Sequence, residues 1–326
     1  MKVYSLFLLL GTFLGASEYR LGHGVEINQY LTLGGYFSTK YENSQKTKEY
    51  MLDDVALLAY GKLSDNFSYL IELEATQFWV RNFGNDTTQK NMHFHIERAW
   101  LSYKYNDYLN LKMGKFITPI GYWNLTPITV LKDTTSNPKY ASEIYPKFTT
   151  GVMAYGYLPF DDSITYNLFL QKNKDLDPNY NNIETDEYYG IEVKKHFENM
   201  TLGINMGEYE VSEEHIQYFG ASLKYQKSKI QILGEYSQLT YNPLNNANEK
   251  HTKYAYYLQG RYKINRKHFV IGRYEKFKDL FHGIDEEIKL IGYNYRPTYP
   301  VSIKCEYQIN SNEADNKVLF SFSMLF

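Results

Sequence analysis

Hydrophobic and polar residues alternate along much of this chain with a period of two. The segment 301–309 is the clearest example, because its residues fall into an apolar and a polar set: Val301, Ile303, Cys305, Tyr307 and Ile309 against Ser302, Lys304, Glu306 and Gln308. The segments 31–38 and 69–76 alternate in the same way. Because successive side chains of a strand point to opposite faces of a sheet, this pattern predicts β-strands with one apolar and one polar face.

The pattern predicts sixteen strands, and a count of fourteen or eighteen remains open because boundaries read from a sequence shift by a few residues. The predicted strands are 28–40, 50–63, 67–79, 93–105, 108–118, 147–157, 163–172, 186–196, 200–209, 215–226, 229–240, 251–263, 266–277, 285–295, 299–309 and 316–326. Most contain ten to fourteen residues. A tilted strand needs about 9 to 11 residues to cross the hydrocarbon core of a membrane.

The connections between these strands alternate in length. Short ones occur at 64–66, 106–107, 158–162, 197–199, 227–228, 264–265 and 296–298, whereas most of the others are longer, at 41–49, 80–92, 119–146, 173–185, 241–250 and 278–284, with shorter ones at 210–214 and 310–315. Alternating side-chain faces also occur in soluble sandwiches, but short turns on one side and long loops on the other are typical of outer-membrane barrels. The sequence therefore predicts an all-β fold, an antiparallel transmembrane β-barrel of about sixteen strands with short periplasmic turns and longer extracellular loops.

Composition agrees with a barrel and excludes several other classes. The chain has 326 residues, 34 of them Tyr, and aromatic residues of this kind form girdles at both membrane interfaces of a barrel. Beyond residue 15 no stretch has the roughly 18 to 20 apolar residues of a spanning helix. The formal net charge of -2 gives no reason to expect a nucleic-acid partner. A single cysteine, Cys305, excludes an internal disulfide and a cysteine-based metal cluster.

The first residues have the pattern of a secretory signal peptide. Lys2 precedes an apolar run at 3–14, which is too short to span a bilayer, and three small residues follow it. A buried first strand or helix is the alternative, but charged residues resume at Glu18. We therefore expect a signal peptide at 1–17 and one domain, an outer-membrane β-barrel, at 18–326.

The last predicted strand ends on an aromatic residue. Its two faces are Val318, Phe320, Phe322, Met324 and Phe326 against Lys317, Leu319, Ser321, Ser323 and Leu325. This segment resembles the terminal strand of Gram-negative outer-membrane barrels. The resemblance implies that Phe326 is the signal read by the barrel-assembly machinery and that the protein lies in the outer membrane of a Gram-negative bacterium. An ordinary last strand is the alternative.

A second resemblance lies at 114–121, which reads Gly-Lys-Phe-Ile-Thr-Pro-Ile-Gly, and in the preceding strand at 98–103, Arg-Ala-Trp-Leu-Ser-Tyr. Both are similar to segments of Gram-negative outer-membrane porins related to the phosphate-selective porin (O/P) family. The resemblance covers about 30 residues and points to a porin, without pointing to phosphate. It implies a homotrimer of sixteen-stranded pores whose third loop, here near 119–146, folds inward.

If the polar faces line a water-filled lumen, their charges influence what passes. The predicted lumen carries ten basic and seven acidic side chains, which predicts a weak anion preference. Our first candidates for the pore lining are Arg98, Lys112, Arg261, Arg273, Lys304, Glu72 and Glu74. The inward loop would add the constriction residues Lys132, Asp133, Lys139 and Glu143, two of each sign. Because no dense run of Arg or Lys is present, passive diffusion of small hydrophilic solutes and ions is the favoured function. A solute-specific channel, for phosphate or an oligosaccharide, is the alternative.

Other functions have weaker support in the sequence. A hydrolase would need a Ser/His pair such as Ser237 with His251 or His268, but no nucleophile motif surrounds these residues. An adhesin or anchor would have a plugged lumen. Two histidines, His93 and His95, are too few for a metal site, and the acidic residues at 175–187 are typical of a loop that faces solvent or lipopolysaccharide. We therefore expect no enzyme activity, cofactor or metal, and as partners small solutes and ions, outer-membrane lipid and lipopolysaccharide.

Overall fold

The computed structural model describes residues 21–90, 94–212, 214–242 and 251–326. The expected signal peptide and His93 lie outside these ranges. No helix in the described part of the chain is long and apolar enough to cross a membrane. Strands dominate the structure, and the few helical segments are short: η1 (Thr129–Leu131), α2 (Lys139–Glu143), η2 (Pro178–Tyr180) and η3 (Glu313–Asp315).

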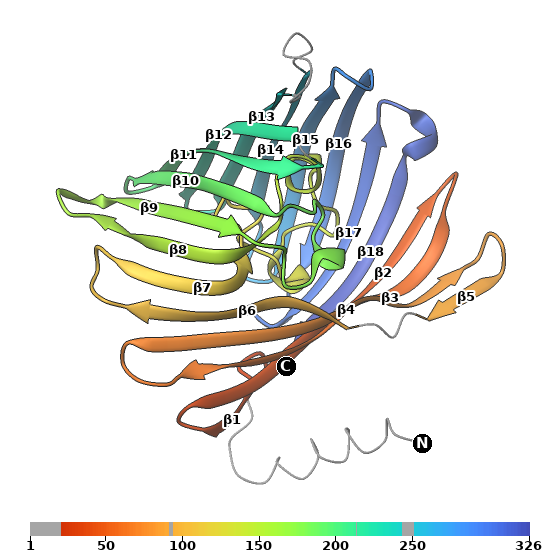
Figure 1. The fold of residues 1–326 in the computed structure, drawn as a ribbon. Coiled ribbons are helices and arrows are strands. Elements are labelled where there is room, and N and C mark those ends of the chain that lie inside the picture. Colours follow the sequence, from red (N-terminus) through yellow and green to blue (C-terminus); the bar gives the residue numbers. More distant parts are fainter. Residues whose placement is uncertain (1–20, 91–93, 213, 243–250) are drawn as a thin grey trace.

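Sixteen long strands follow one another round a single antiparallel sheet. They are β2 (Leu31–Ser44), β3 (Lys48–Lys62), β4 (Phe67–Asn82), β6 (His95–Lys104), β7 (Asn110–Ile117), β8 (Phe148–Leu158), β9 (Asp161–Lys172), β10 (Glu187–His196), β11 (Met200–Val211), β12 (Glu214–Lys227), β13 (Ile230–Asn242), β14 (His251–Lys263), β15 (His268–Asp279), β16 (Ile284–Tyr295), β17 (Val301–Asn310) and β18 (Lys317–Leu325). Each pairs with its neighbour in sequence, and β18 pairs with β2. The sheet is therefore a closed barrel (Figure 1), and the predicted fold and strand number are confirmed.

Two short strands extend this barrel at its rim. β1 (Val25–Asn28) pairs with the start of β2, and β5 (Thr87–Lys90) pairs with the end of β4. The segment 80–92, expected to be a loop, thus contains a small hairpin in its described part. The hairpin forms because β4 extends to Asn82, beyond its predicted end, and its last residues pair with β5.

The barrel wall is apolar outside and polar inside, the reverse of a soluble protein. On β17 the side chains of Ser302, Lys304, Glu306 and Gln308 are at most 4% exposed, whereas those of Ile303, Tyr307 and Ile309 are 41–47% exposed. The inner and outer faces of β17 are therefore the ones that the alternation of residues predicted. A barrel with this outer surface is suited to hydrocarbon, because each strand pairs with a neighbour on both sides and the sheet has no open edge.

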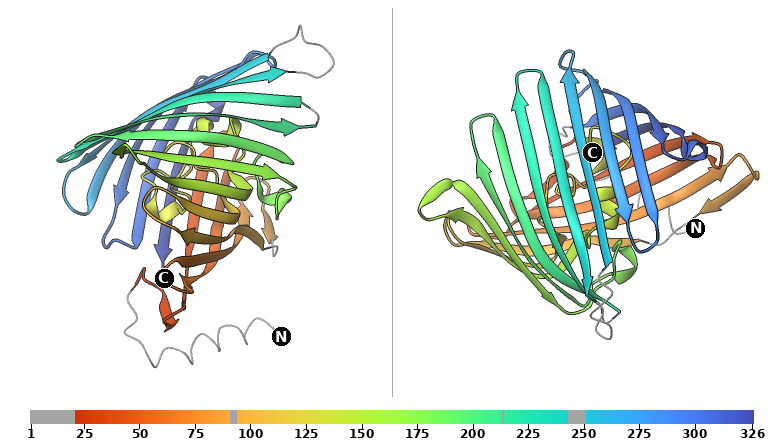
Figure 2. Two further views of the ribbon diagram at one scale, coloured as in Figure 1. Left: turned by 60° about the vertical axis from the view of Figure 1, so that its left-hand side comes forward. Right: turned by 90° about the horizontal axis from the view of Figure 1, so that it is seen from above.

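Two connections fold into the barrel from the same end. The inward loop (118–147) joins β7 to β8, and the second loop (173–186) joins β9 to β10. Figure 2 shows the inward loop and α2 enclosed by the strands. We call the end from which both loops enter the long-loop end and the opposite end, with connections such as 197–199 and 228–229, the short-turn end.

The last residue closes the seam of the barrel. Phe326 donates its backbone N–H to the carbonyl of Gly35 at 2.8 Å, and its own backbone oxygen accepts from the Gly35 N–H at 3.0 Å. Its ring lies against the glycine, since a Cβ at Gly35 would be 2.6 Å from the Phe326 Cζ and 2.4 Å from the Ala56 carbonyl oxygen. The seam therefore requires a residue without a side chain at position 35.

We expect Gly35→Val to reduce the fraction of folded barrel strongly. The added side chain must displace the Phe326 ring or the β3 backbone, and overpacking of this kind costs about 1–3 kcal/mol or more. Heat-dependent migration on SDS gels measures the folded fraction. Gly272→Val is the matched control, because nothing lies within 4 Å of a Cβ at Gly272. Equal folding of the two variants would contradict this account of the seam.

Candidate pore and constriction

Buried carboxylates of the wall hold the inward loop by its backbone N–H groups. Glu192 accepts from Gly121 N at 2.7 Å, and Glu275 accepts from Lys139 N at 2.9 Å. Glu306 accepts from two consecutive N–H groups, those of Thr135 and Ser136, at 2.8 and 3.0 Å. Because a loop with little regular structure cannot satisfy its own backbone donors, these contacts replace the hydrogen bonds that burial removes.

Basic side chains of the wall bind the carbonyl groups of the same loop. Lys194 Nζ donates to the carbonyl of Gly121 at 2.7 Å, and Arg296 Nη2 donates to that of Lys132 at 3.1 Å. Lys304 donates to the carbonyl of Thr129. The alternating acidic and basic residues of the lumen thus match alternating donors and acceptors on the loop, which fixes its position across the barrel.

Arg273 makes the largest set of contacts to the loop. Its Nη1 and Nη2 atoms donate to the side-chain oxygens of Thr134 and Ser136, each at 2.7 Å, and Nη1 also reaches the carbonyl of Ser136 at 3.1 Å. Its Nε donates to Glu275 Oε1 at 2.7 Å. The guanidinium also lies 5.2 Å from the ring of Trp123. Arg273 is only 3% exposed, so it holds the loop and has little contact with solvent.

The other pore-lining candidates from the sequence also face the interior, with different partners. Arg98 pairs with the buried Glu72, and Glu74 accepts from the Tyr36 hydroxyl at 2.9 Å. Arg261 Nη1 donates to Asp133 Oδ1 of the inward loop at 2.8 Å, and Lys112 Nζ lies 4.5 Å from the ring centroid of Trp100. Most of these charges therefore contact protein groups.

The second loop is held inside by a buried ion pair that sequence reasoning missed. Lys115 Nζ lies 2.6 Å from Asp175 Oδ1, and both side chains are fully buried. The same ammonium reaches the carbonyl of Asp177 at 3.1 Å. The feature of the sequence that could have indicated this ion pair is the glycine at position 114. The φ of Gly114 is +114°, and this conformation breaks the strand alternation and turns Lys115 into the lumen.

The second loop also clamps the end of the inward loop. Asn182 Oδ1 accepts from the backbone N–H of Lys147 at 2.7 Å, and Asn182 Nδ2 donates to the carbonyl of Tyr145 at 3.0 Å. The ring of Tyr180 stacks on His95, with centroids 4.8 Å apart, and its hydroxyl bonds to Glu74. The two loops therefore form one layer across the lumen.

A cluster of buried, mostly aromatic side chains lies between the inward loop and the wall from β7 to β15. It includes Phe116, Ile120, Trp123, Tyr140, Tyr145, Phe169, Tyr188, Tyr209, Tyr218 and Tyr257. Burial raises the pKa of the two loop tyrosines, Tyr140 and Tyr145, well above the ordinary value, so both stay neutral. Part of the tyrosine content expected at membrane interfaces thus lies inside the barrel, where it closes one side of the lumen.

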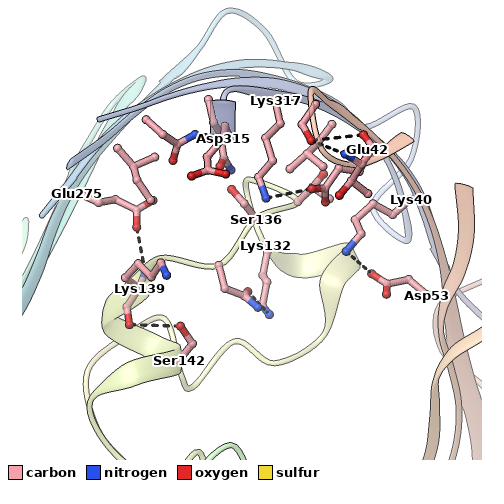
Figure 3. A pocket seen from close by; sticks show the side chains of 18 of the residues that line it. Lys40, Glu42, Asp53, Lys132, Ser136, Lys139, Ser142, Glu275, Asp315 and Lys317 are labelled. Carbon is pink, nitrogen blue, oxygen red and sulfur yellow. Dashed lines mark hydrogen bonds and ion pairs between the residues drawn. The ribbon is translucent and has the colours of Figure 1, made fainter. Parts of the chain in front are cut away.

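The open side of the lumen contains a cavity of about 880 Å³ at the long-loop end. Nine acidic and six basic side chains line it, namely Glu42, Asp53, Asp54, Glu74, Glu97, Glu275, Asp285, Glu286 and Asp315 with Lys40, Lys46, Lys132, Lys139, Lys147 and Lys317. Figure 3 shows Lys132 and Lys139 on the inward loop, with Lys40, Asp53 and Glu275 on the surrounding wall. β-Bulges between Phe37 and Thr39 and between Leu52 and Asp54 disturb the alternation here, which is why sequence reasoning missed Asp53.

Two smaller cavities lie at the short-turn end. One, of about 590 Å³, is lined by charged residues that include Lys62, Lys104 and Lys194. The other, of about 230 Å³, lies beneath the inward loop and is lined by Lys224, Arg261 and other residues. Lys132 lines both this cavity and the large one. It therefore marks the place where the two ends of the lumen meet.

The four constriction candidates have distinct positions. Lys132 Nζ donates to Asn137 Oδ1 at 2.9 Å and faces the cavity, and burial lowers its pKa to about 8. Lys139 lies 3.1 Å from Glu286 at the cavity wall. Asp133 is turned towards Arg261, and Glu143 is half-buried outside the cavity lining. Among the four, the lysines are thus the ones that line the large cavity.

Several residues of the alternative sites considered from the sequence have other partners in the structure. His95 pairs with Asp177 at 3.3 Å, and no group of three His, Cys, Asp or Glu side chains in that part of the chain could hold a metal ion. The Ser237 hydroxyl donates to the carbonyl of Phe219 at 3.0 Å, while His268 bonds to Tyr293. The structure therefore gives Ser237 and His268 separate partners.

Comparison with known proteins places the fold. No family model matches the sequence, and no curated protein does. The anion-selective porin from Comamonas acidovorans is 11% identical, with a TM-score of 0.67 over 91% of this chain and 99% of that one. The chain has the fold of outer-membrane porins.

Two further solved structures agree with this porin fold. OmpF of Salmonella typhi, in a complex with daunomycin, is 10% identical, with a TM-score of 0.67 over 93% of this chain and 99% of that one. A loop L8 deletion mutant of OmpT, an outer membrane protein of Vibrio cholerae, is 15% identical, with a TM-score of 0.63 over 91% and 99%. At such identities the likeness establishes the architecture of the porin-like barrel, and function has to be argued from the site.

Proposed function

We propose that this protein is a porin of the Gram-negative outer membrane, through which small hydrophilic solutes and ions diffuse. The observation that carries the proposal is a closed barrel with an apolar outer face and charged cavities on both sides of the inward loop. A charged, hydrated lumen suits polar solutes, whose passage then depends on size, hydration and field. No reaction chemistry is required of any side chain.

We infer that three copies associate, since one of the similar structures is described as the trimer form of OmpT of Vibrio cholerae. The proposed setting adds outer-membrane lipid, lipopolysaccharide and the barrel-assembly machinery as partners, the last through Phe326. Cross-linking in outer-membrane vesicles tests the association. A monomer-only pattern would contradict the trimer and leave the channel itself untouched.

Single-channel recording tests the channel. Purified protein in planar bilayers should give discrete current steps at both voltage polarities without voltage-dependent closure, because an aqueous path needs no gating. Ser142→Trp should lower the step size, since Ser142 is exposed and lines the large cavity. Lys174→Trp is the control, because Lys174 is exposed on the second loop outside that lining. Folded protein without current steps would reject the porin and favour an anchor or a hydrolase.

The weak anion preference expected from the sequence has less support than the channel itself. Arg273 and Lys304 contact the loop, and the large cavity has more acidic than basic residues. We therefore expect a reversal potential close to zero in a KCl gradient. Strong anion selectivity would show that the cavity charges do not control permeation and would favour a phosphate-specific channel.

Raising the pH from 7 to 9 should reduce the passage of anions. The pKa of Lys132 is lowered to about 8, so its ammonium is charged below that pH and is lost above it. Between pH 7 and pH 9 the reversal potential should then move towards the value of a cation-selective channel. Lys132→Gln should remove most of this shift. An unchanged shift in Lys132→Gln would assign the titration to another group.

A further inference from the structure

The two ends of the lumen carry opposite net charge. The cavity at the long-loop end has nine acidic and six basic side chains. Lys132 lines cavities at both ends and is left out of the comparison. The two cavities at the short-turn end together then have more basic than acidic side chains, namely Lys62, Lys104, Lys194, Lys224 and Arg261 with Asp65, Asp107 and Asp133. Charge is therefore separated along the axis of the proposed pore, from acidic to basic.

Most of the charges without ion pairs among the described residues follow the same separation, with Lys132 in the long-loop cavity and Asp65 in a short-turn cavity as exceptions. At the long-loop end Asp54 accepts hydrogen bonds only from neutral groups, the hydroxyls of Ser38 at 3.0 Å and Thr129 at 2.7 Å, among the described residues. At the short-turn end Lys224 lies 5.9 Å from the ring of Tyr122, and in the part of the chain that the structure describes neither it nor Lys62 forms an ion pair. Unpaired charges act on passing ions more strongly than neutralised pairs do.

Such a pore has two zones that collect opposite ions. Cations accumulate in the acidic zone and anions in the basic one, provided that the field extends across the lumen. The Debye length is about 30 Å at 0.01 M salt and about 3 Å at 1 M, so the two zones govern the current at low salt and are screened at high salt.

We propose that this channel rectifies ionic current, with the larger current when the long-loop end is positive. That polarity drives cations from the acidic zone and anions from the basic zone towards Lys132, so both accumulate in the pore. The opposite polarity pulls both away and depletes the pore of carriers. The inference rests on the proposed porin function and adds a direction to it: organic cations enter most readily at the long-loop end.

Current–voltage curves of oriented channels test this inference. A Cys305→Ser, Ser311→Cys protein labelled by an impermeant thiol reagent from one side reports which end faces that side, because Ser311 is exposed at the long-loop end. At 0.01 M KCl the currents at opposite voltages of 100 mV should differ about twofold, and at 1 M they should be nearly equal. A symmetric curve at low salt, or the opposite polarity, overturns the inference while leaving the porin intact. Absence of any current contradicts the porin itself.

Charge variants separate the effect of charge from that of pore shape. Asp54→Asn should weaken rectification by removing acidic charge, and Lys224→Gln should weaken it by removing basic charge. Lys174→Gln, at an exposed position outside all three cavities, is the matched control and should leave the ratio unchanged. Rectification that persists equally in all three variants would come from pore shape and would overturn the charge-based inference.

Discussion

Replacing Arg273 with methionine is expected to release the centre of the inward loop and to raise the single-channel conductance. Arg273 binds three oxygen atoms of Thr134 and Ser136, and methionine keeps its bulk but none of these bonds. The loop separates the cavities at the two ends, so its displacement widens the path between them. We expect the mean conductance to rise about twofold, with noisier open-channel current.

The same substitution should lower the stability of the barrel. Arg273 pairs with Glu275, and both are almost fully buried. Removing one partner of a buried pair costs about 3–5 kcal/mol, and here the remaining bond from Lys139 N to Glu275 keeps the loss at the lower end. Urea unfolding in lipid vesicles measures the change.

Arg261→Met is the control for Arg273→Met. The Arg261 side chain is 25% exposed and bonds to the loop only through Asp133 Oδ1. It should change conductance less and cost less stability. If Arg261→Met opened the channel as much as Arg273→Met, the fixing of the loop would have to be assigned to Asp133 instead of the Thr134–Ser136 segment.

The barrel could be predicted from the sequence because its wall is periodic. On β17 and β18 each residue belongs to one of two faces, and one face must be apolar in a membrane. The seam could also be expected, since the apolar face of β18 continues to Phe326. What the sequence did not indicate is the partner of that residue, Gly35, which lies at the other end of the chain.

The lumen could be predicted only in part. Alternation places Lys304 and Glu306 inside, but it does not say whether they meet water or a loop. Their partners, Thr129, Thr135 and Ser136, lie in a segment without periodicity, so only the folded structure brings them together. The predicted lumen faces of the strands have more basic than acidic residues, whereas the large cavity has more acidic than basic ones.

Irregular strand positions account for further differences. At Gly114 a Cβ would lie 2.2 Å from the carbonyl oxygen of Ala99, and the backbone adopts a conformation that other residues rarely take. The alternation is interrupted there, so Lys115 enters the lumen and meets Asp175. This ion pair explains why a loop that was expected to face solvent lies inside the barrel.

Replacing Lys115 with methionine should expel the second loop from the lumen. The substitution leaves the buried Asp175 carboxylate without a cation, and such an unpaired charge costs about 3–5 kcal/mol. Asn181 Nδ2, 3.1 Å from Asp175 Oδ2, is a neutral donor and cannot replace the ammonium. Asp175 should therefore move to water and take residues 173–186 with it. Trypsin should then cleave after Lys174 much faster than in the unmodified protein.

The double variant Lys115→Met, Asp175→Leu distinguishes loss of the ion pair from general damage to the lumen. It removes both charges and keeps apolar bulk next to Phe148, whose ring centroid lies 5.1 Å from Lys115 Nζ. Because well-packed apolar residues can replace a buried pair at little cost, the double variant should regain most of the stability lost in Lys115→Met. Protection of Lys174 from trypsin should return with it. If the double variant were cleaved as fast as the single one, the second loop would be held mainly by its contacts at Tyr180 and Asn182, and the buried pair would contribute little to its position.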